Sequence, residues 1–215
     1  MPKGSPELTR ARIDEIVDAC EGLYQDHSFK EITVDMIAKD TTFTRASIYN
    51  YFKNKEEIFL ALLQREYAAW NESLERILEE PALDTEGFAG ALATSLDDRM
   101  QLLKLLSMNH YDMEASSRPE NLMEFKREYG RSLALVRECL DRFFPEMPDG
   151  AKRDFVYTFF PEMFGIYAYT VVTDKQRMAM GEAGVDYLYQ TPHDLVYHSV
   201  YRLLTIGDRA SESQE

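Results

Sequence analysis

The sequence predicts an all-α protein with a small N-terminal helical domain and a larger C-terminal one. Nearly every strong hydrophobic pattern has the three- and four-residue spacing of an amphipathic helix. Two short helical patterns lie close together near the N-terminus, between two longer ones. The chain has 215 residues, which is enough for two such domains, and 45% hydrophobic with 29% charged residues is typical of a folded globular protein.

In the first half, polar residues that favour helix N-termini mark where each helix begins. Thr33, Thr44 and Asn54 each precede a helical pattern and can accept hydrogen bonds from its first free N–H groups. Glu57 lies three residues after Asn54, where a carboxylate can reach back to the start of the helix. Pro81 ends the last pattern. The expected helices cover residues 10–25, 34–38, 45–51 and 55–80.

The second half continues the helical pattern after a linker at 81–90. Residues 109–112 are expected to form a loop, and 174–191 an irregular segment containing two glycines. Pro161 lies inside a helical pattern and should kink it, because proline lacks the backbone N–H. The expected helices cover residues 88–107, 119–143, 151–173 and 193–206.

Charge and composition exclude several classes of protein. The formal net charge of -14 argues against indiscriminate binding to nucleic acids. No apolar run approaches the length of a membrane span, and the N-terminus lacks the apolar core of a secretory signal. Cys20 and Cys139 lie far apart and form no metal-binding or disulfide pattern. We therefore expect a cytoplasmic protein without cofactor or metal.

One short window departs from the acidic average. Residues 41–55 read TTFTRASIYNYFKNK, with Arg45, Lys53 and Lys55 and no acidic residue. The window spans the turn and the second of two short helices, an arrangement suited to placing a helix in the major groove of DNA. Within it, Ile48 and Phe52 lie one helical turn apart and are expected to pack inside.

The other side chains of the window fit contacts with DNA. Hydroxyl, phenol, guanidinium and ammonium groups can donate to phosphate oxygens. An alanine can touch a thymine methyl group, and an asparagine can pair with adenine through two hydrogen bonds. The candidates in and near the window are Thr44, Arg45, Ala46, Ser47, Tyr49, Asn50, Tyr51 and Lys55.

The run ITVDMIAKDTTFTRASIYNYFKNKEEIFLALL, and above all SIYNYFKNKEEI, resembles the DNA-binding domain of the tetracycline-repressor (TetR) family of transcriptional regulators. The resemblance covers about residues 10–65. It implies a helix-turn-helix DNA-binding domain in 1–54, a connecting helix 55–80 and a regulatory and dimerisation domain in 81–215. It further implies a ligand-responsive homodimeric repressor on a near-palindromic operator.

The resemblance also assigns contacts residue by residue. Thr33, Thr44, Arg45, Tyr49 and Lys55 match phosphate-contacting positions. Ala46, Ser47, Asn50 and Tyr51 match positions that face the bases or the groove. The chain departs from the family in two places, because Thr42 and His27-Ser28 stand where glycine is usual. A residue other than glycine carries a steric cost at positive φ, so the turn at Thr42 is expected to have its own shape.

Two other classes of protein remain open. Residues 1–60 carry eight basic and eleven acidic side chains, a net charge of 8 − 11 = −3, so a protein-binding co-regulator on the same fold is the main alternative to DNA binding. An enzyme or metal protein is disfavoured, because no nucleophile motif or phosphate-binding loop occurs. The pattern His110-x-Asp112-x-Glu114 is better interpreted as solvated acidic residues.

The C-terminal two-thirds is rich in Met and aromatic residues. Most of these should form the core, but buried phenols need partners and Met lines adaptable cavities. We therefore expect a pocket for an apolar or aromatic effector between helices of residues 100–170. Its candidate residues are Met108, Tyr111, Phe125, Tyr129, Phe164 and Tyr167.

The last helix offers a candidate dimer interface, because a terminal helix with an apolar face often pairs across a two-fold axis. The resemblance adds parts of 151–173 to this interface. The alternative is that the face packs within its own subunit. The candidate residues are Leu195, Val196, Val200, Leu203 and Leu204.

Overall fold

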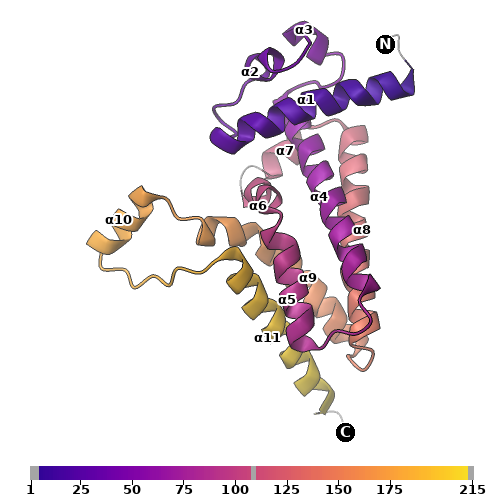
Figure 1. Cartoon of the computed structure of the whole chain (residues 1–215), viewed down its shortest axis with the longest axis vertical. Helices are drawn as coiled ribbons and strands as arrows, with labels where there is room; N and C mark the ends of the chain where they lie inside the picture. The colour runs from indigo at the N-terminus through magenta and orange to yellow at the C-terminus, as the bar shows by residue number, and fades with distance from the viewer. Residues whose placement is uncertain (1–4, 108–109, 213–215) are drawn as a thin grey trace. The chain divides into compact units, whose positions relative to one another are not determined.

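The computed structural model describes residues 5–107 and 110–212, and their side chains except those of His110 and residues 206–212. All regular elements of these residues are helices, which confirms the all-α prediction (Figure 1). In chain order they are α1 (Pro6–Asp26), α2 (Val34–Lys39), α3 (Arg45–Ile48), α4 (Lys55–Glu79), α5 (Thr85–Asp97), α6 (Met100–Ser107), α7 (His110–Ser116), α8 (Pro119–Phe143), α9 (Asp149–Thr170), α10 (Asp174–Glu182) and α11 (Pro192–Glu212).

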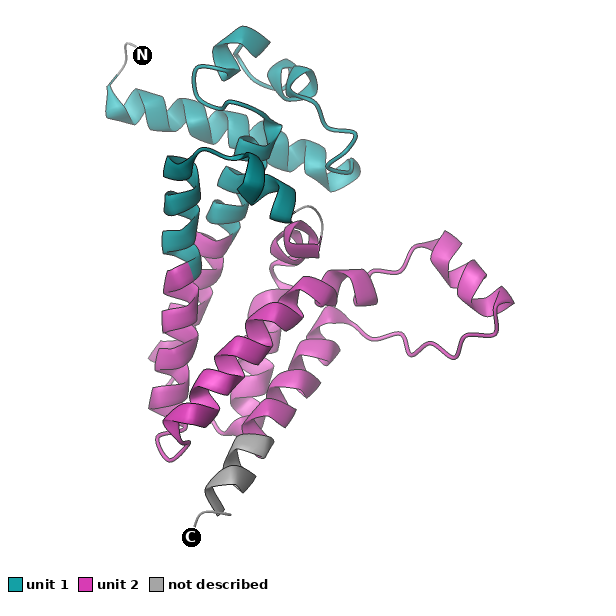
Figure 2. Ribbon diagram, turned by 180° about the vertical axis from the view of Figure 1, so that it is seen from behind, with its two compact units in different colours: residues 1–66, 108–129 teal, residues 67–107, 130–215 magenta. Residues whose placement is uncertain are grey.

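The chain divides into two compact units (Figure 2). The first contains residues 1–66 and 108–129, and the second contains 67–107 and 130–215. The long helices α4 and α8 each pass from the first unit into the second. Residues 108–129 therefore group with the N-terminal helices, although the sequence places them far inside the expected regulatory domain.

The first unit is built around aromatic and branched side chains from α1 to α4. Tyr24 and Phe29 both meet the ring of Phe59 edge-on, with ring centroids 5.1 and 4.8 Å apart. Ile37 of α2 and Ile48 of α3 are fully buried. Complete burial of an isoleucine side chain contributes roughly 1.5–3 kcal/mol, so these two residues fix the short helices to the unit.

In the second unit α5 packs against α11, and α9 packs against both α6 and α11. Trp70 of α4 is fully buried, and its Nε1 donates to Oγ of Ser95 at 3.0 Å. Beside it, Ser132 of α8 donates to Oδ1 of Asn71 at 2.6 Å. Because both polar pairs are satisfied internally, the helices can bury them without the cost of an unpaired group.

The second half of the chain differs from the sequence prediction in three places. The expected helix 88–107 is broken at Asp98 and Arg99 into α5 and α6. The sequence pattern did not reveal this break, because both helices bury leucines and the apolar spacing continues across it. The expected loop at 109–112 was wrong at 110–112, which begin α7, and the expected irregular segment 174–191 was wrong at 174–182, which form α10. Pro161 lies within α9, which is assigned as one helix on both sides of it.

Helix α10 is capped rather than packed. Thr173 and Gln176 form a complete capping box, in which each side chain binds the other residue's backbone N–H. No residue of α10 is buried, and the helix stands away from the other helices of its unit (Figure 1). Local hydrogen bonds therefore hold this helix, whereas burial holds the rest of the unit.

Candidate nucleic-acid interface

The two short helices α2 and α3 begin at the predicted caps. Oγ1 of Thr33 accepts from the N–H of Met36, and Oγ1 of Thr44 accepts from the N–H of Ser47, both at 3.3 Å. Helix α3 ends at Ile48, and the chain continues through hydrogen-bonded turns to Phe52, so the expected helix 45–51 is regular only in its first part. Both caps are thus confirmed.

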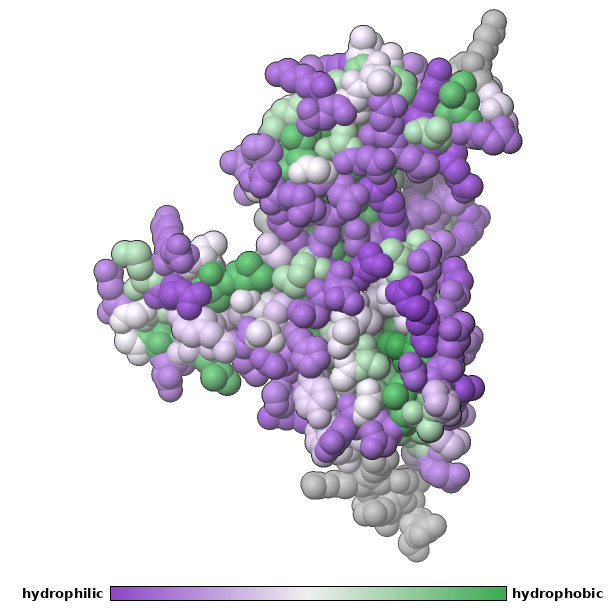
Figure 3. Space-filling model, viewed as in Figure 1, coloured by the Kyte–Doolittle hydropathy of each residue, from purple (hydrophilic) through white to green (hydrophobic). Residues whose placement is uncertain are grey.

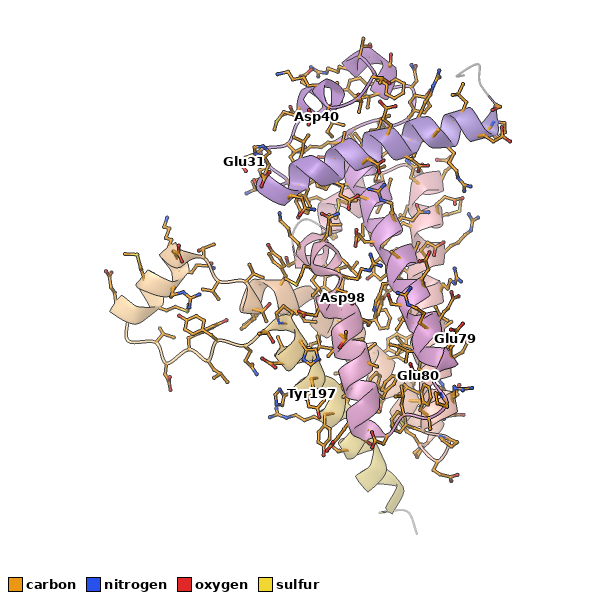
Figure 4. The ribbon with its side chains drawn as sticks, viewed as in Figure 1. Glu31, Asp40, Glu79, Glu80, Asp98 and Tyr197 are labelled. Atoms are coloured by element: carbon orange, nitrogen blue, oxygen red, sulfur yellow. The ribbon has the colours of Figure 1, made fainter. Side chains whose placement is uncertain are left out.

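The turn between α2 and α3 is held by side chains in place of the usual glycine. Oγ1 of Thr41 donates to the carbonyl of Ala38 at 3.1 Å and accepts from the N–H of Phe43 at 3.3 Å. The N–H of Thr42 donates to Oε1 of Glu15, on α1, at 2.6 Å. The turn is therefore fixed both by hydrogen bonds of Thr41 within the helix pair and by a hydrogen bond from Thr42 to α1. Figure 4 labels Asp40, which ends α2 and begins this turn.

One edge of α3 and of the turn after it faces solvent. Ile48 and Phe52 point inward and are buried, as the spacing predicts. Ser47 and Tyr51 are half-buried, and Nη1 of Arg12, on α1, donates to the phenol oxygen of Tyr51 at 2.9 Å. The exposed residues of the predicted DNA-binding set are Thr33, Thr44, Arg45, Ala46, Tyr49 and Asn50.

The guanidinium of Arg45 already has protein partners. Its Nη1 lies 2.8 Å from Oδ2 of Asp35 on α2, and its Nη2 donates to the phenol oxygen of Tyr49 at 3.3 Å. The hydrogen bond to Tyr49 and the charge of Asp35 raise the pKa of Arg45, which keeps it charged. A phosphate that binds Arg45 therefore competes with Asp35 for the same group.

Lys55 is turned into the protein. Its Nζ donates to the carbonyls of Phe29 at 2.7 Å and Ile32 at 3.1 Å, and lies 4.3 Å from the centre of the Phe29 ring. An ammonium has three donors, so these contacts leave one for a phosphate. The structure thus gives Lys55 a role in holding the loop after α1, in addition to the contact expected from the sequence.

A buried carboxylate lies at the start of α4. Glu57 is fully buried, and its Oε2 accepts from the N–H of Lys53 at 2.7 Å. Arg118, which precedes α8, donates to both carboxylate oxygens through Nε and Nη2 at 2.8 Å. Burial by itself raises the pKa of Glu57, but the hydrogen bonds from Arg118 and from the N–H groups of Lys53 and Arg118 outweigh it, so the pKa is lowered.

Arg12, Glu15, Asp35 and Arg118 were not among the predicted site residues. Each acts through a contact with a residue distant in sequence, so the helical pattern gives no signal for it. For Arg118 the separation from Glu57 is 61 residues.

The predicted pocket residues do not gather in one unit. Tyr111, on α7, is 82% exposed, whereas Phe125, on α8, is buried, with the ring of Tyr129 6.3 Å away. These three belong to the first unit, whereas Phe164 and Tyr167 of α9 belong to the second and are half-buried. Met108 lies outside the described residues. The effector pocket therefore stays a prediction.

The predicted dimer residues split into two groups. Val196, Val200 and Leu204 are buried within the second unit, where α11 packs against α5 and α9. Here the alternative applies, because the apolar face is covered by the chain's own helices. Leu195 and Leu203 are half-buried and line an open groove of about 500 Å³ with Glu162, His198, Ser199 and Arg202.

The neighbouring surface of the second unit carries exposed aromatic and apolar groups. Tyr197 of α11, labelled in Figure 4, stacks between His193 and Tyr201 at 6.3 and 6.2 Å. Tyr157 and Tyr169 of α9 are 70% and 67% exposed, and Leu188 is 76% exposed. Figure 3 shows hydrophobic residues at the surface of the projecting segment around α10. This surface, unlike the buried stripe of α11, is open to a partner.

Other kinds of site find no support in the described residues. None of their His, Cys, Asp and Glu side chains gather in a group of three that could hold a metal ion. Cys20 and Cys139 are both free and buried, and burial raises the pKa of the Cys139 thiol to about 12. None of the described helices is long and apolar enough to span a membrane.

A capped helix pair, fixed between two longer helices and with one polar edge exposed, defines the helix-turn-helix class of regulatory protein. Residues 16–62 match the family described as bacterial regulatory proteins, tetR family, and residues 64–190 match the tetracyclin repressor-like C-terminal domain. The chain belongs to this family.

Individual relatives are more distant. The chain is 27% identical over 144 residues to an HTH-type transcriptional repressor of Streptomyces coelicolor, covering 66% of this chain and 70% of the relative. It is 30% identical over 80 residues to the fatty acid metabolism regulator protein of Bacillus subtilis, covering 37% of this chain and 41% of that relative. A solved structure of FadR from Bacillus subtilis in complex with stearoyl-CoA has a TM-score of 0.57 at 18% identity, covering 90% and 98% of the two chains.

Proposed function

We propose that the protein is a sequence-specific DNA-binding transcriptional regulator, and that it acts as a repressor in the cytoplasm. The observation that carries this proposal is the exposed polar edge of α3, which α1, α2 and α4 hold in place. Membership of the tetR family supports it.

In this proposal the predicted DNA-binding residues divide by chemistry. Thr33, Thr44, Arg45 and Tyr49 contact phosphates, because their hydroxyl and guanidinium groups are short or charged donors. The edge residues Ala46, Ser47 and Asn50 face the bases, with Tyr51 at the side of the groove. Lys55 contributes mainly by fixing the loop at Phe29 and Ile32, and through its remaining donor to a phosphate.

The acidic surroundings set the mode of binding. With few basic side chains at the edge, the protein makes few phosphate contacts, so non-specific affinity is low and base contacts supply more of the total. The charge of Asp35 reduces phosphate binding further, since it already neutralises Arg45.

The test is fluorescence anisotropy with duplexes that tile the DNA around the protein's own gene, compared with a scrambled duplex at two salt concentrations. We expect saturable binding to one near-palindrome, weakened by salt, by Arg45→Ala and by Tyr49→Phe. Absence of any preference over scrambled DNA at low salt would contradict the proposal. A protein-binding co-regulator would then be the better interpretation, and a pull-down with the intact chain would examine it.

We further propose that an apolar effector releases the DNA, and that long-chain acyl-CoA thioesters are the first class to test. The fold resembles that of FadR proteins whose structures contain stearoyl-CoA and lauroyl-CoA. The many Met and aromatic residues of the chain suit an acyl chain. A ligand that stabilises the protein at saturating concentration should raise its melting temperature. No shift with acyl-CoA thioesters, free fatty acids or aromatic compounds would count against such a pocket.

The regulator is proposed to act as a homodimer through the open surface of the second unit. Leu188, Leu195 and Leu203 line the groove there, and the exposed Tyr169 lines an adjoining pocket with Leu188 and Leu195. Changing Leu195 and Leu203 together to Glu should yield a folded monomer in sedimentation. The matched control is Leu8→Glu, at an exposed leucine of the first unit, which should leave the dimer intact. A dimer that survives the double change would move the interface elsewhere.

A further inference from the structure

The corner between α7 and α8 touches the chain that joins the recognition helix α3 to α4, within the first unit. Nη2 of Arg118 donates to the carbonyl of Tyr51 at 2.8 Å. Nδ2 of Asn54 donates to the carbonyl of Ser116 at 2.9 Å. Two contacts thus join segments more than sixty residues apart in sequence, and both fall in the few residues that follow α3.

The carboxylate of Glu57 ties the same two segments together. Its oxygens accept four hydrogen bonds, from the N–H of Lys53 and from the N–H, Nε and Nη2 of Arg118. A carboxylate offers about four acceptor sites, so this one is fully satisfied. Because Glu57 is fully buried, loss of the Arg118 side chain would leave its charge with only two hydrogen bonds, from the backbone N–H groups of Lys53 and of residue 118.

These contacts fix the backbone on both sides of Phe52. The carbonyl of Tyr51 is bound by Arg118, and the N–H of Lys53 is bound by Glu57. The phenol of Tyr51 is bound from the other direction by Arg12. The C-terminal end of the recognition segment is therefore positioned by a residue that the sequence would assign to the regulatory half.

We propose that Arg118 is a positioning residue for DNA recognition, which acts through Glu57 and the Tyr51 carbonyl and does not touch DNA. The proposal rests on the DNA-binding function proposed above. The planar guanidinium matters because Nε and Nη2 bind both oxygens of one carboxylate while Nη2 also reaches the carbonyl. A lysine ammonium cannot reproduce this pattern of parallel bonds.

The chain offers a matched control on the helix that follows Arg118. Arg127 of α8 belongs to the same unit, is largely exposed and pairs with Glu124 one turn away. Arg127→Ala removes the same charge as Arg118→Ala without touching the recognition segment. Any effect of overall charge on DNA binding should therefore be shared by both variants.

The experiment measures anisotropy of the full chain on operator and scrambled duplexes, for Arg118→Ala, Arg118→Lys, Glu57→Gln and Arg127→Ala, with circular dichroism to confirm folding. Arg118→Ala should bind the operator ~10- to 100-fold more weakly than the wild type, because its base contacts are misaligned. Binding to scrambled DNA and the slope of affinity against salt should stay unchanged, because the phosphate contacts remain. Arg118→Lys should recover little, and Arg127→Ala should lose little.

A double variant separates positioning from other roles. If Arg118 acts through Glu57, Arg118→Ala combined with Glu57→Gln should lose no more than the larger single change. Equal losses on both duplexes, with a salt slope reduced by about 0.9, would identify a direct phosphate contact and overturn the proposal. Unchanged operator binding by folded Arg118→Ala would also overturn it.

Hydrogen exchange tests the positioning contact without DNA. The amide of Lys53 should exchange faster in Arg118→Ala and Arg118→Lys than in the wild type and Arg127→Ala. If the wild type binds no operator, the proposed function fails, and this measurement still shows whether Arg118 orders the recognition segment. Unchanged exchange at Lys53 in both Arg118 variants would overturn the positioning role.

Discussion

Removing the carboxylate of Asp35 should strengthen operator binding while slightly weakening the fold. Asp35 lies 2.8 Å from Arg45, and both side chains are about half exposed, at 56% and 55%. An exposed pair of this kind is worth about 0.2–1 kcal/mol, which a phosphate has to replace when it binds Arg45. Asp35→Asn removes that competition.

Asp35 also repels the phosphate directly. A phosphate on the free side of the same guanidinium would lie ~6 Å from the carboxylate, where the repulsion in water is about 0.7 kcal/mol. Together the two effects give about 1 kcal/mol, or roughly a fivefold gain in operator affinity at low salt. The loss of a carboxylate from the first turn of α2 should cost about 0.3–1 kcal/mol of stability.

Anisotropy at low and high salt measures the affinity, and urea unfolding measures the stability. Asp40→Asn is the control, because Asp40 is an exposed carboxylate at the end of the same helix that forms no salt bridge within the described residues. It should change affinity less than Asp35→Asn does. In an Arg45→Ala background the gain from Asp35→Asn should shrink. Unchanged or weaker binding by Asp35→Asn would refute the competition, and would mean that Asp35 orients Arg45 in the complex.

Three other substitutions, at Lys55, Ser95 and Glu57, each remove hydrogen bonds described above, and their effects follow from that loss. Lys55→Met should destabilise the first unit by roughly 1–3 kcal/mol, because the carbonyls of Phe29 and Ile32 lose a charged donor, while the salt slope of DNA binding falls by less than the ~0.9 expected for Arg45→Ala. Ser95→Ala should cost about 1–3 kcal/mol in urea unfolding followed by Trp70 fluorescence, since the indole N–H loses its acceptor, whereas the exposed Thr94→Ala should stay within ~0.5 kcal/mol. Because the pKa of Glu57 is lowered in the folded protein, its ionised carboxylate stabilises the fold fully above the ordinary pKa of 4.5, and this stabilisation is lost as pH falls through the lower pKa of the folded state. Glu57→Gln should therefore flatten the acid side of a curve of stability against pH measured by circular dichroism. An acid limb as steep in Glu57→Gln as in the wild type would assign the loss to other carboxylates.

The helix-turn-helix could be predicted because its signals are local. Thr33 and Thr44 cap helices that begin at the next residue, and the inward positions Ile48 and Phe52 follow from helical spacing alone. The capping box of α10 was equally local, since Thr173 precedes Gln176 by three residues, and could have been found by the same rule. Two glycines nearby favoured an irregular segment instead.

The remaining features depend on contacts that helical spacing does not encode. Arg118 meets Glu57 across 61 residues, and Lys55 turns toward carbonyls rather than solvent. The apolar stripe of α11 predicts burial, but the sequence alone cannot tell a partner from the chain's own α5. The outcome was burial within the chain for Val196, Val200 and Leu204.

The cap of α10 has a consequence for how the protein responds to its own concentration. A helix of nine residues lies below the ~12–15 residues at which isolated helices become marginally stable in water. The capping box is therefore its main support in a single chain, where Met178 and Leu188 are both largely exposed. If a second copy covers them, amide protection and protease resistance of residues 174–190 should rise together as the protein is concentrated. The order of residues 174–190 would then report how much of the protein is associated with a second subunit.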